Sequence, residues 1–178
     1  MPTHRNNSTK TISKKHWLLT GAFLLLTILG SKIDLDFGGL VSFTLQTLFL
    51  GLAYYYLPLP NRLTLVVVYL LLGIVGAPVF NGGDGLSYVL SYPLGFFVGF
   101  VASAFVPVNK SERFSQSLLY FMVLHVVILS LGVLWLLHYD SLSVAAENAK
   151  SLSIGMVVKS LTATTIVMLV SKTKNTLG

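Results

Sequence analysis

Six apolar runs, each close to the length of a membrane crossing, recur along the sequence of 178 residues. They occupy roughly residues 17–31, 43–59, 63–79, 92–108, 118–137 and 154–170. A helix needs about 20 predominantly apolar residues to cross a bilayer. Because 54% of the residues are apolar and only 10% are charged, a soluble domain is excluded. The sequence predicts an all-α integral membrane protein with six transmembrane helices. A membrane domain, 17–171, would lie between a basic tail, 1–16, and a short tail, 172–178.

Lysine and arginine are distributed unevenly between the two sets of predicted loops. One set, with the termini, carries Arg5, Lys10, Lys14, Lys15, Arg62, Lys110, Arg113, Lys172 and Lys174, whereas the other carries only Lys32 and Lys150. Cytoplasmic loops of membrane proteins hold the excess of basic residues. The protein is therefore predicted to lie in the inner (plasma) membrane of the cell with both termini cytoplasmic. Residues 34–41, 80–91 and 140–152 would face the outside. The basic residues are scattered, so the net charge of +6 does not indicate nucleic-acid binding.

A glycine-rich loop separates the third and fourth predicted helices. Pro78 is expected to end the third helix, and Gly82, Gly83 and Gly85 permit backbone conformations that other residues avoid. Asn81, Tyr88 and Tyr92 stand where such a loop could fold over a pocket. The sequence thus predicts a cap over a ligand site, the alternative being an ordinary exposed loop.

Small residues recur at a spacing of four on the helices beside this loop. Gly73 and Ala77 lie on the third predicted helix, and Gly95, Gly99 and Ser103 on the fourth. Such stripes let helix backbones approach closely in lipid, so these residues are predicted to serve helix packing.

Two ionisable side chains other than tyrosine fall within the predicted spans. His125 is either functional or a neutral histidine bonded to a serine, threonine or carbonyl of a neighbouring helix. Lys159 lies near the outer end of the sixth span, where it either faces a ligand or extends to the interface. The spans contain no aspartate or glutamate, so the carboxylate of a ligand could supply an opposite charge for Lys159.

Three motifs in order, FTLQTL at 43–48, YLLLGIVGAPVFNGG at 69–83 and GMVVK at 155–159, resemble the BioY family. Members of that family are biotin-specific substrate-binding subunits, or S components, of energy-coupling-factor (ECF) vitamin importers. Met156 stands where the family has an aspartate, and SYPLGFF at 91–97 differs from the family's GPTGGYL. The resemblance is therefore to a divergent member. The alternatives are another small carboxylated vitamin-like ligand or a structural membrane protein that transports nothing.

The resemblance implies a substrate-binding set at the outer end of the helices. Its members are Thr44, Gln46, Phe80, Asn81, Gly82, Gly83, Tyr88, Tyr92, Met156 and Lys159. Gln46 can both donate and accept hydrogen bonds, which suits a urea-like ligand, although the Thr44/Gln46 pair could instead satisfy a neighbouring helix.

The implied partners are biotin, a transmembrane coupling subunit and two cytoplasmic ATPases. The family's docking stripe on the first helix is absent, because Leu18 and Leu26 flank Ala22 at a spacing of four. Gly21 and Ala22 remain as a smaller candidate docking patch. The sequence has no GxxxxGK[ST] phosphate loop, no cysteine and no acid–base constellation within the spans, so we expect no enzyme activity, catalytic residue, cofactor or metal site.

Overall fold

The computed structural model describes residues 13–35, 43–111 and 113–177. These residues form seven helices: α1 (Lys14–Lys32), α2 (Gln46–Tyr56), α3 (Leu59–Ile74), α4 (Gly85–Val89), α5 (Leu94–Ser103), α6 (Phe114–Leu136) and α7 (Leu142–Leu177). A short antiparallel ladder joins β1 (Asp34–Leu35) to β2 (Phe43–Thr44). The predicted all-α fold is confirmed. Most of the basic tail 1–16 and of the predicted loop 34–41 lies outside the described residues, and Lys14 to His16 already belong to α1.

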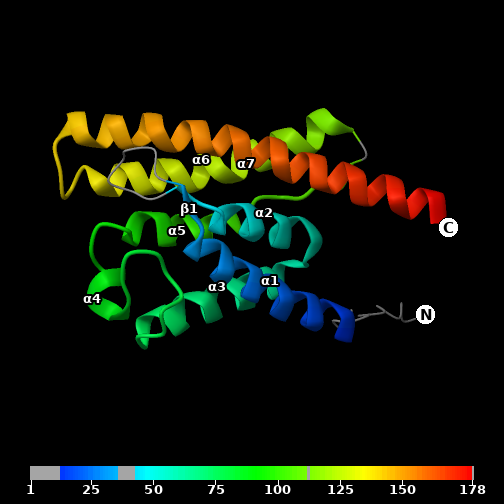
Figure 1. Cartoon of the computed structure of the whole chain (residues 1–178), viewed down its shortest axis with the longest axis horizontal. Coiled ribbons are helices and arrows are strands. Elements are labelled where there is room, and N and C mark those ends of the chain that lie inside the picture. The colour runs from blue at the N-terminus through cyan, green and yellow to red at the C-terminus, as the bar shows by residue number, and fades with distance from the viewer. Residues whose placement is uncertain (1–12, 36–42, 112, 178) are drawn as a thin grey trace, which may run out of the picture.

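The helices lie roughly along one direction in two layers (Figure 1). The long helices α6 and α7 form one layer, and α6 also packs against α5. In the other layer α1 packs against both α2 and α3, and α2 reaches α7 across the layers. The amino-terminal end of α1 and the carboxyl-terminal end of α7 lie at one end of the molecule, and α4 lies at the other (Figure 1).

Several helices differ in length from the predicted spans. Among the described residues, only α6 and the segment Leu142–Lys174 of α7 are long and apolar enough to cross a membrane by themselves. Helix α2 ends at Tyr56 because Pro58 follows its C-cap, and Pro107 follows the end of α5 at Ser103. Prolines therefore shorten two of the predicted spans.

The predicted end of the third helix at Pro78 is wrong. Helix α3 ends at Ile74, and Gly76 adopts φ +90° just after it. The Ala77 amide donates to the Leu72 carbonyl (2.9 Å) and the Gly76 amide to the Gly73 carbonyl (3.1 Å). This is the bonding of a Schellman motif, which requires the left-handed conformation that glycine adopts without steric cost.

Two loop predictions are also wrong in part. The segment predicted as the outer loop 140–152 is helical from Leu142 onward, because Ser141 accepts a hydrogen bond from the Val144 amide and good helix formers follow. The glycine-rich loop contains the short helix α4, whose polar and glycine-rich surroundings concealed it.

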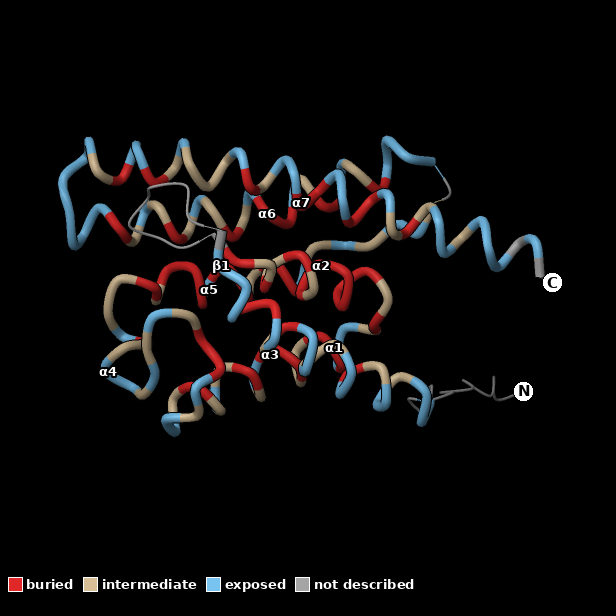
Figure 2. The backbone as a smooth tube through the Cα atoms, in the orientation of Figure 1, coloured by how far each residue is buried: buried red, intermediate tan, exposed pale blue. Residues whose placement is uncertain are grey.

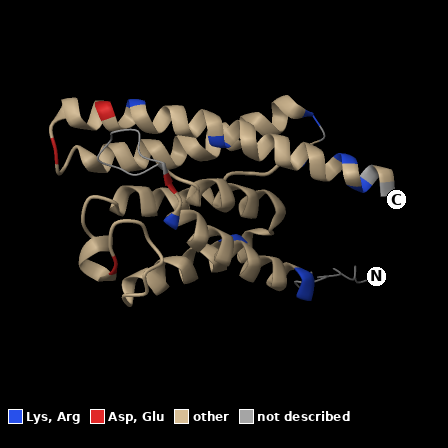
Figure 3. Cartoon of the chain, viewed as in Figure 1, with Lys and Arg blue, Asp and Glu red and all other residues tan. Residues whose placement is uncertain are grey.

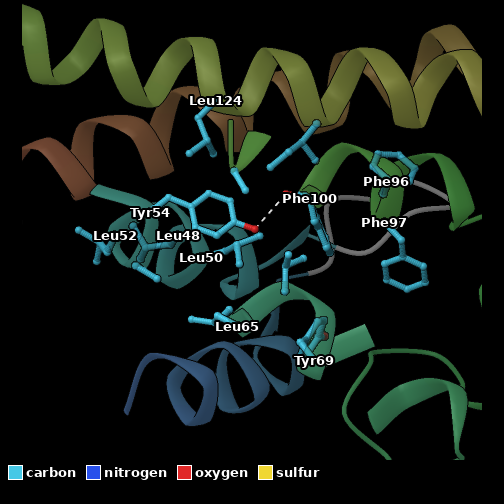
Figure 4. Packing of buried hydrophobic residues seen from close by; sticks show 14 of the residues in the cluster. Leu48, Leu50, Leu52, Tyr54, Leu65, Tyr69, Phe96, Phe97, Phe100 and Leu124 are labelled. Atoms are coloured by element: carbon cyan, nitrogen blue, oxygen red, sulfur yellow. Dashed lines mark hydrogen bonds between the residues drawn. The ribbon is translucent and has the colours of Figure 1, made fainter. Parts of the chain in front are cut away.

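Residues on the sides of the helices between the layers are mostly buried, and those on the outward sides are mostly exposed (Figure 2). At the centre of the core the Tyr54 hydroxyl donates to the Phe100 carbonyl at 2.9 Å, with Leu124 of α6 nearby (Figure 4). As predicted, Gly99 permits a close approach of helices, since a Cβ at this position would lie 2.8 Å from the Ile128 Cα. Gly73 has a different role from the one predicted. A Cβ there would stand 1.9 Å from the Phe80 ring, so it accommodates a loop side chain rather than a helix.

Charged residues are sparse along the helices, and most of them lie near helix ends (Figure 3). Arg62 is an exception to the expectation that basic residues lie in exposed loops, because it is buried in the first turn of α3. Its guanidinium donates to the carbonyls of Leu57 (2.9 Å), Ala104 (3.1 Å) and Val106 (3.2 Å). Arg62 thereby ties the turn between α2 and α3 to the end of α5.

Candidate functional site

A partly open cavity lies between the two layers, beside the glycine-rich loop. The volume of the cavity that is open to the centre of a water molecule is about 120 Å³. Its walls come from the start of α2, the loop before α4, helices α4 to α6 and the middle of α7. The lining residues are Thr44, Gln46, Thr47, Phe80, Asn81, Tyr88, Tyr92, Pro93, Phe96, Phe97, Phe100, His125, Ile128, Leu129, Leu152, Met156 and Lys159.

One side of the cavity is covered by residues 76–93, which we call the cap loop. Within it, the Tyr88 hydroxyl donates to the Asn81 carbonyl at 2.6 Å and lies 3.4 Å from the Tyr92 hydroxyl. Burial and the contact with Tyr92 raise the pKa of Tyr88 above its ordinary value, at which the hydroxyl is already protonated at neutral pH. Gly82 has φ +89°, and a Cβ at Gly83 would overlap the Tyr88 ring. These two glycines shape the cap loop.

The cap loop is fastened to the end of α1. The Val79 carbonyl accepts hydrogen bonds from Ser31 (2.6 Å) and from Tyr69 (2.9 Å). The Lys32 ammonium donates to the Phe80 carbonyl, and the Asn81 side-chain amide donates to the Asp34 carboxylate at 2.8 Å. Contacts from α1, β1 and α3 therefore hold the cap loop over the cavity.

Aromatic rings form the apolar wall. The Phe80 and Phe97 rings lie 4.6 Å apart, and Phe97 contacts the Phe100 ring at 5.7 Å between centroids. Figure 4 shows Phe96, Phe97 and Phe100 projecting from one short helix, α5. Such a wall suits a ligand with an apolar ring or alkyl chain.

Other lining residues are polar, and one of them is Lys159. This side chain is buried, and its ammonium donates to the Thr44 carbonyl and to the Thr47 hydroxyl, both at 2.9 Å. Because α7 begins at Leu142, Lys159 lies several turns inside the helix rather than near its start. The alternative in which Lys159 extends to the interface is therefore wrong.

Unlike the ammonium of Lys159, two polar atoms of cavity-lining residues are buried and have no hydrogen-bond partner among the described residues. They are Nε2 of Gln46 and Nε2 of His125. Nδ1 of His125 lies 2.8 Å from the Phe121 carbonyl and 3.1 Å from the Ser160 hydroxyl. The predicted contact of this histidine with a serine of a neighbouring helix is thus present, through Ser160 of α7, whereas the Phe121 carbonyl belongs to α6 itself. The ring also borders the cavity.

Most of the predicted substrate-binding set meets at this cavity. Its lining includes Thr44, Gln46, Phe80, Asn81, Tyr88, Tyr92, Met156 and Lys159, but not Gly82 or Gly83. The lining also includes His125, whose role the sequence left open, and residues that the sequence did not predict: Thr47, Pro93, Phe96, Phe97, Phe100, Ile128, Leu129 and Leu152. An apolar side chain that faces a pocket has no sequence signal to separate it from one that faces the core or lipid.

Gly21 and Ala22, the predicted docking patch, are exposed on α1. A Cβ at Gly21 would meet no other described atom within 4 Å, apart from the backbone of its own helix. In the described part of the chain, no cluster of three or more histidine, aspartate or glutamate side chains could hold a metal ion.

Comparison with a solved structure supports the fold. The structure is titled the S-component for biotin from an ECF-type ABC transporter. It matches this chain with a TM-score of 0.68, covering 91% of this chain and 95% of that chain at 18% identity. This chain therefore shares the fold of that protein, with a partly open cavity between two layers of helices.

Sequence comparisons give the family. The Thermotoga maritima "Biotin transporter BioY" is 34% identical over 141 residues, which cover 77% of this chain and 80% of that protein. A "Probable biotin transporter BioY" from Lysinibacillus sphaericus is 38% identical over 89 residues, which cover 50% of this chain and 45% of that protein. The profile of the BioY family matches residues 4–177, and the chain belongs to this family.

Proposed function

We propose that this protein is a biotin-binding S component of an ECF importer. The observation that carries the proposal is the capped cavity, which combines an aromatic wall with a buried ammonium and side-chain amides. Biotin has matching parts: an apolar ring and alkyl chain, a carboxylate and a ureido group. Lys159 suits the carboxylate, and the amides of Gln46 and Asn81 suit the ureido group, since an amide both donates and accepts.

The experiment that tests this function is a ligand titration. Detergent-purified protein is titrated with biotin, lipoate, thiamine and riboflavin, and heat of binding or intrinsic fluorescence is followed. Biotin is expected to bind most tightly, because it alone offers both a carboxylate and a urea to the polar wall. Failure of biotin to bind, with clear binding of lipoate, would indicate that Met156 in the cavity wall accompanies a different carboxylated ligand.

We further propose six membrane crossings, with both termini cytoplasmic and the cap loop outside. The lysine and arginine asymmetry of the sequence supports this orientation. The short helices α2, α3 and α5 would complete their crossings with the non-helical segments that adjoin them, where neighbouring helices satisfy the backbone. The cavity would then receive its ligand from outside the cell.

Cysteine labelling in intact cells tests the orientation, and the natural sequence has no cysteine to interfere. Single cysteines should react with a membrane-impermeant thiol reagent when they replace Ser87 or Ser143. Ser87 is an exposed residue of the cap loop, and Ser143 lies at the exposed start of α7. A cysteine at Ser111 should react only after the membrane is permeabilised. Labelling of Ser111 alone in intact cells would reverse the proposed orientation.

Transport would depend on a transmembrane coupling subunit and two cytoplasmic ATPases. The sequence has no phosphate-binding loop of its own, which supports a separate source of ATP hydrolysis. Helix α1 offers exposed apolar side chains such as Leu18, Leu25 and Leu29 beside Gly21 and Ala22. We propose this face as the site that receives the coupling subunit.

A further inference from the structure

His125 holds a polar atom at the cavity wall that no protein group in the described part of the chain satisfies. The residue lies in the middle of α6 and is 4% exposed. Nε2 of its ring is buried without a hydrogen-bond partner among the described residues, and the ring borders the cavity. A buried polar atom left without a partner costs free energy, so its position beside an open cavity points to a ligand.

The contacts of Nδ1 determine what Nε2 can do. Nδ1 lies 2.8 Å from the Phe121 carbonyl, which can only accept, and 3.1 Å from the Ser160 hydroxyl, which can donate or accept. A proton on Nδ1 satisfies the shorter of the two contacts and is compatible with the other. In the neutral ring Nε2 then has a lone pair and acts as an acceptor. The ammonium of Lys159 lines the same cavity, and two positive charges in one buried site are unfavourable, so the neutral ring is preferred.

We infer that Nε2 of His125 accepts a hydrogen bond from an N–H group of the ligand and helps to determine specificity. This inference rests on the proposed function, under which the donor is a ureido N–H of biotin. The described lining contains no aspartate or glutamate to take such a proton donor. His125 therefore supplies an uncharged acceptor on α6, in the same lining as the amide of Gln46 on α2 and the ammonium of Lys159 on α7.

Two substitutions of His125 separate binding from structure. His125→Asn retains a donor near the position of Nδ1, where it can reach the Phe121 carbonyl, but removes the acceptor at Nε2. His125→Gln places an amide oxygen near the position of Nε2 and gives up the contact of Nδ1. If Nε2 binds the ligand, biotin affinity should fall roughly tenfold to a hundredfold in His125→Asn and much less in His125→Gln. A purely structural histidine predicts the reverse order.

Biotin derivatives methylated at one or the other ureido nitrogen supply a second readout. The parent protein should bind biotin more tightly than the derivative that lacks the N–H facing His125. In His125→Asn the ratio of these two affinities should fall towards one. Equal losses for biotin and for both derivatives would overturn the inference, as would unchanged biotin binding in His125→Asn. Thermal unfolding of each variant in detergent identifies any that fails to fold, and the other variant then carries the comparison.

These measurements also keep the inference apart from the proposed function. If the parent protein binds no biotin, the proposed function fails and the inference fails with it. If the parent binds biotin and the preference between biotin and its methylated derivatives is the same in parent and His125→Asn, only the role of His125 is refuted.

Discussion

Lys159→Ala is expected to weaken biotin binding by at least about thirtyfold, since loss of one partner of a buried charge pair commonly costs about 2 to 5 kcal/mol. The ammonium is buried at the cavity wall, where its attraction for a carboxylate is far less screened than in water. Titration of the purified variant with biotin measures the effect. Lys150→Ala is the matched control, because Lys150 is an exposed lysine of the same helix, and its affinity should equal that of the parent.

A second comparison identifies what Lys159 contacts. If the ammonium pairs with the carboxylate, the neutral amide of biotin should bind the parent protein far more weakly than the acid. Little difference between acid and amide would instead assign Lys159 to the ureido group. Lys159 also donates hydrogen bonds to Thr44 and Thr47, so its loss can lower the stability of the protein. The thermal unfolding of the variant is therefore recorded as well. Parent-like affinity in a folded Lys159→Ala variant would remove the residue from the site.

Gly95→Ala is expected to destabilise the protein by about 3 kcal/mol, at the upper end of the usual cost of overpacking. The new Cβ would stand 2.3 Å from the Trp135 Cβ and 2.4 Å from the Leu131 carbonyl oxygen. Neither atom can swing away, so α5 and α6 would have to separate. Because α5 also carries Phe96, Phe97 and Phe100, ligand affinity should fall together with the unfolding temperature measured in detergent.

Gly21→Ala is the matched control for this prediction. It is the same substitution within an apolar helix, at a position where a Cβ meets no described atom within 4 Å beyond the helix backbone. Alanine favours helix by up to about 1 kcal/mol over glycine, so this variant should be as stable as the parent or slightly more stable. Equal unfolding temperatures for the two variants would show that α5 and α6 do not need a glycine at their contact.

Some of the polar residues that line the cavity were predicted from the sequence, whereas Thr47 was not and the role of His125 was left open. Asn81, Tyr88 and Lys159 are conspicuous in a chain that is otherwise apolar, and each meets the cavity. The aromatic wall could not be anticipated in this way. Phe97 differs in no sequence property from a phenylalanine that faces lipid, and only the packing of α5 against the cap loop turns it towards the pocket.

Some helix ends also have local causes that the sequence shows, and others do not. Gly76 and the prolines around α2 and α3 act through their own backbone chemistry, so the breaks they cause can be read from the sequence in principle. The early start of α7 at Leu142 could not be read from hydropathy, because its first turns are polar. Their outward side is exposed, while Ala145 and Asn148 are buried.

By itself, the sequence determined that the chain is an all-α membrane protein of the BioY family, because apolar length and ordered motifs are properties of the chain alone. Only the tertiary structure decided which of the polar residues within the helices face one cavity. In that structure Lys159 is buried against the start of α2, and His125 contacts Ser160 and lines the cavity. The reason is that a side chain's direction depends on how its helix is rotated against its neighbours, which close-packed contacts at residues such as Gly95 and Gly99 determine.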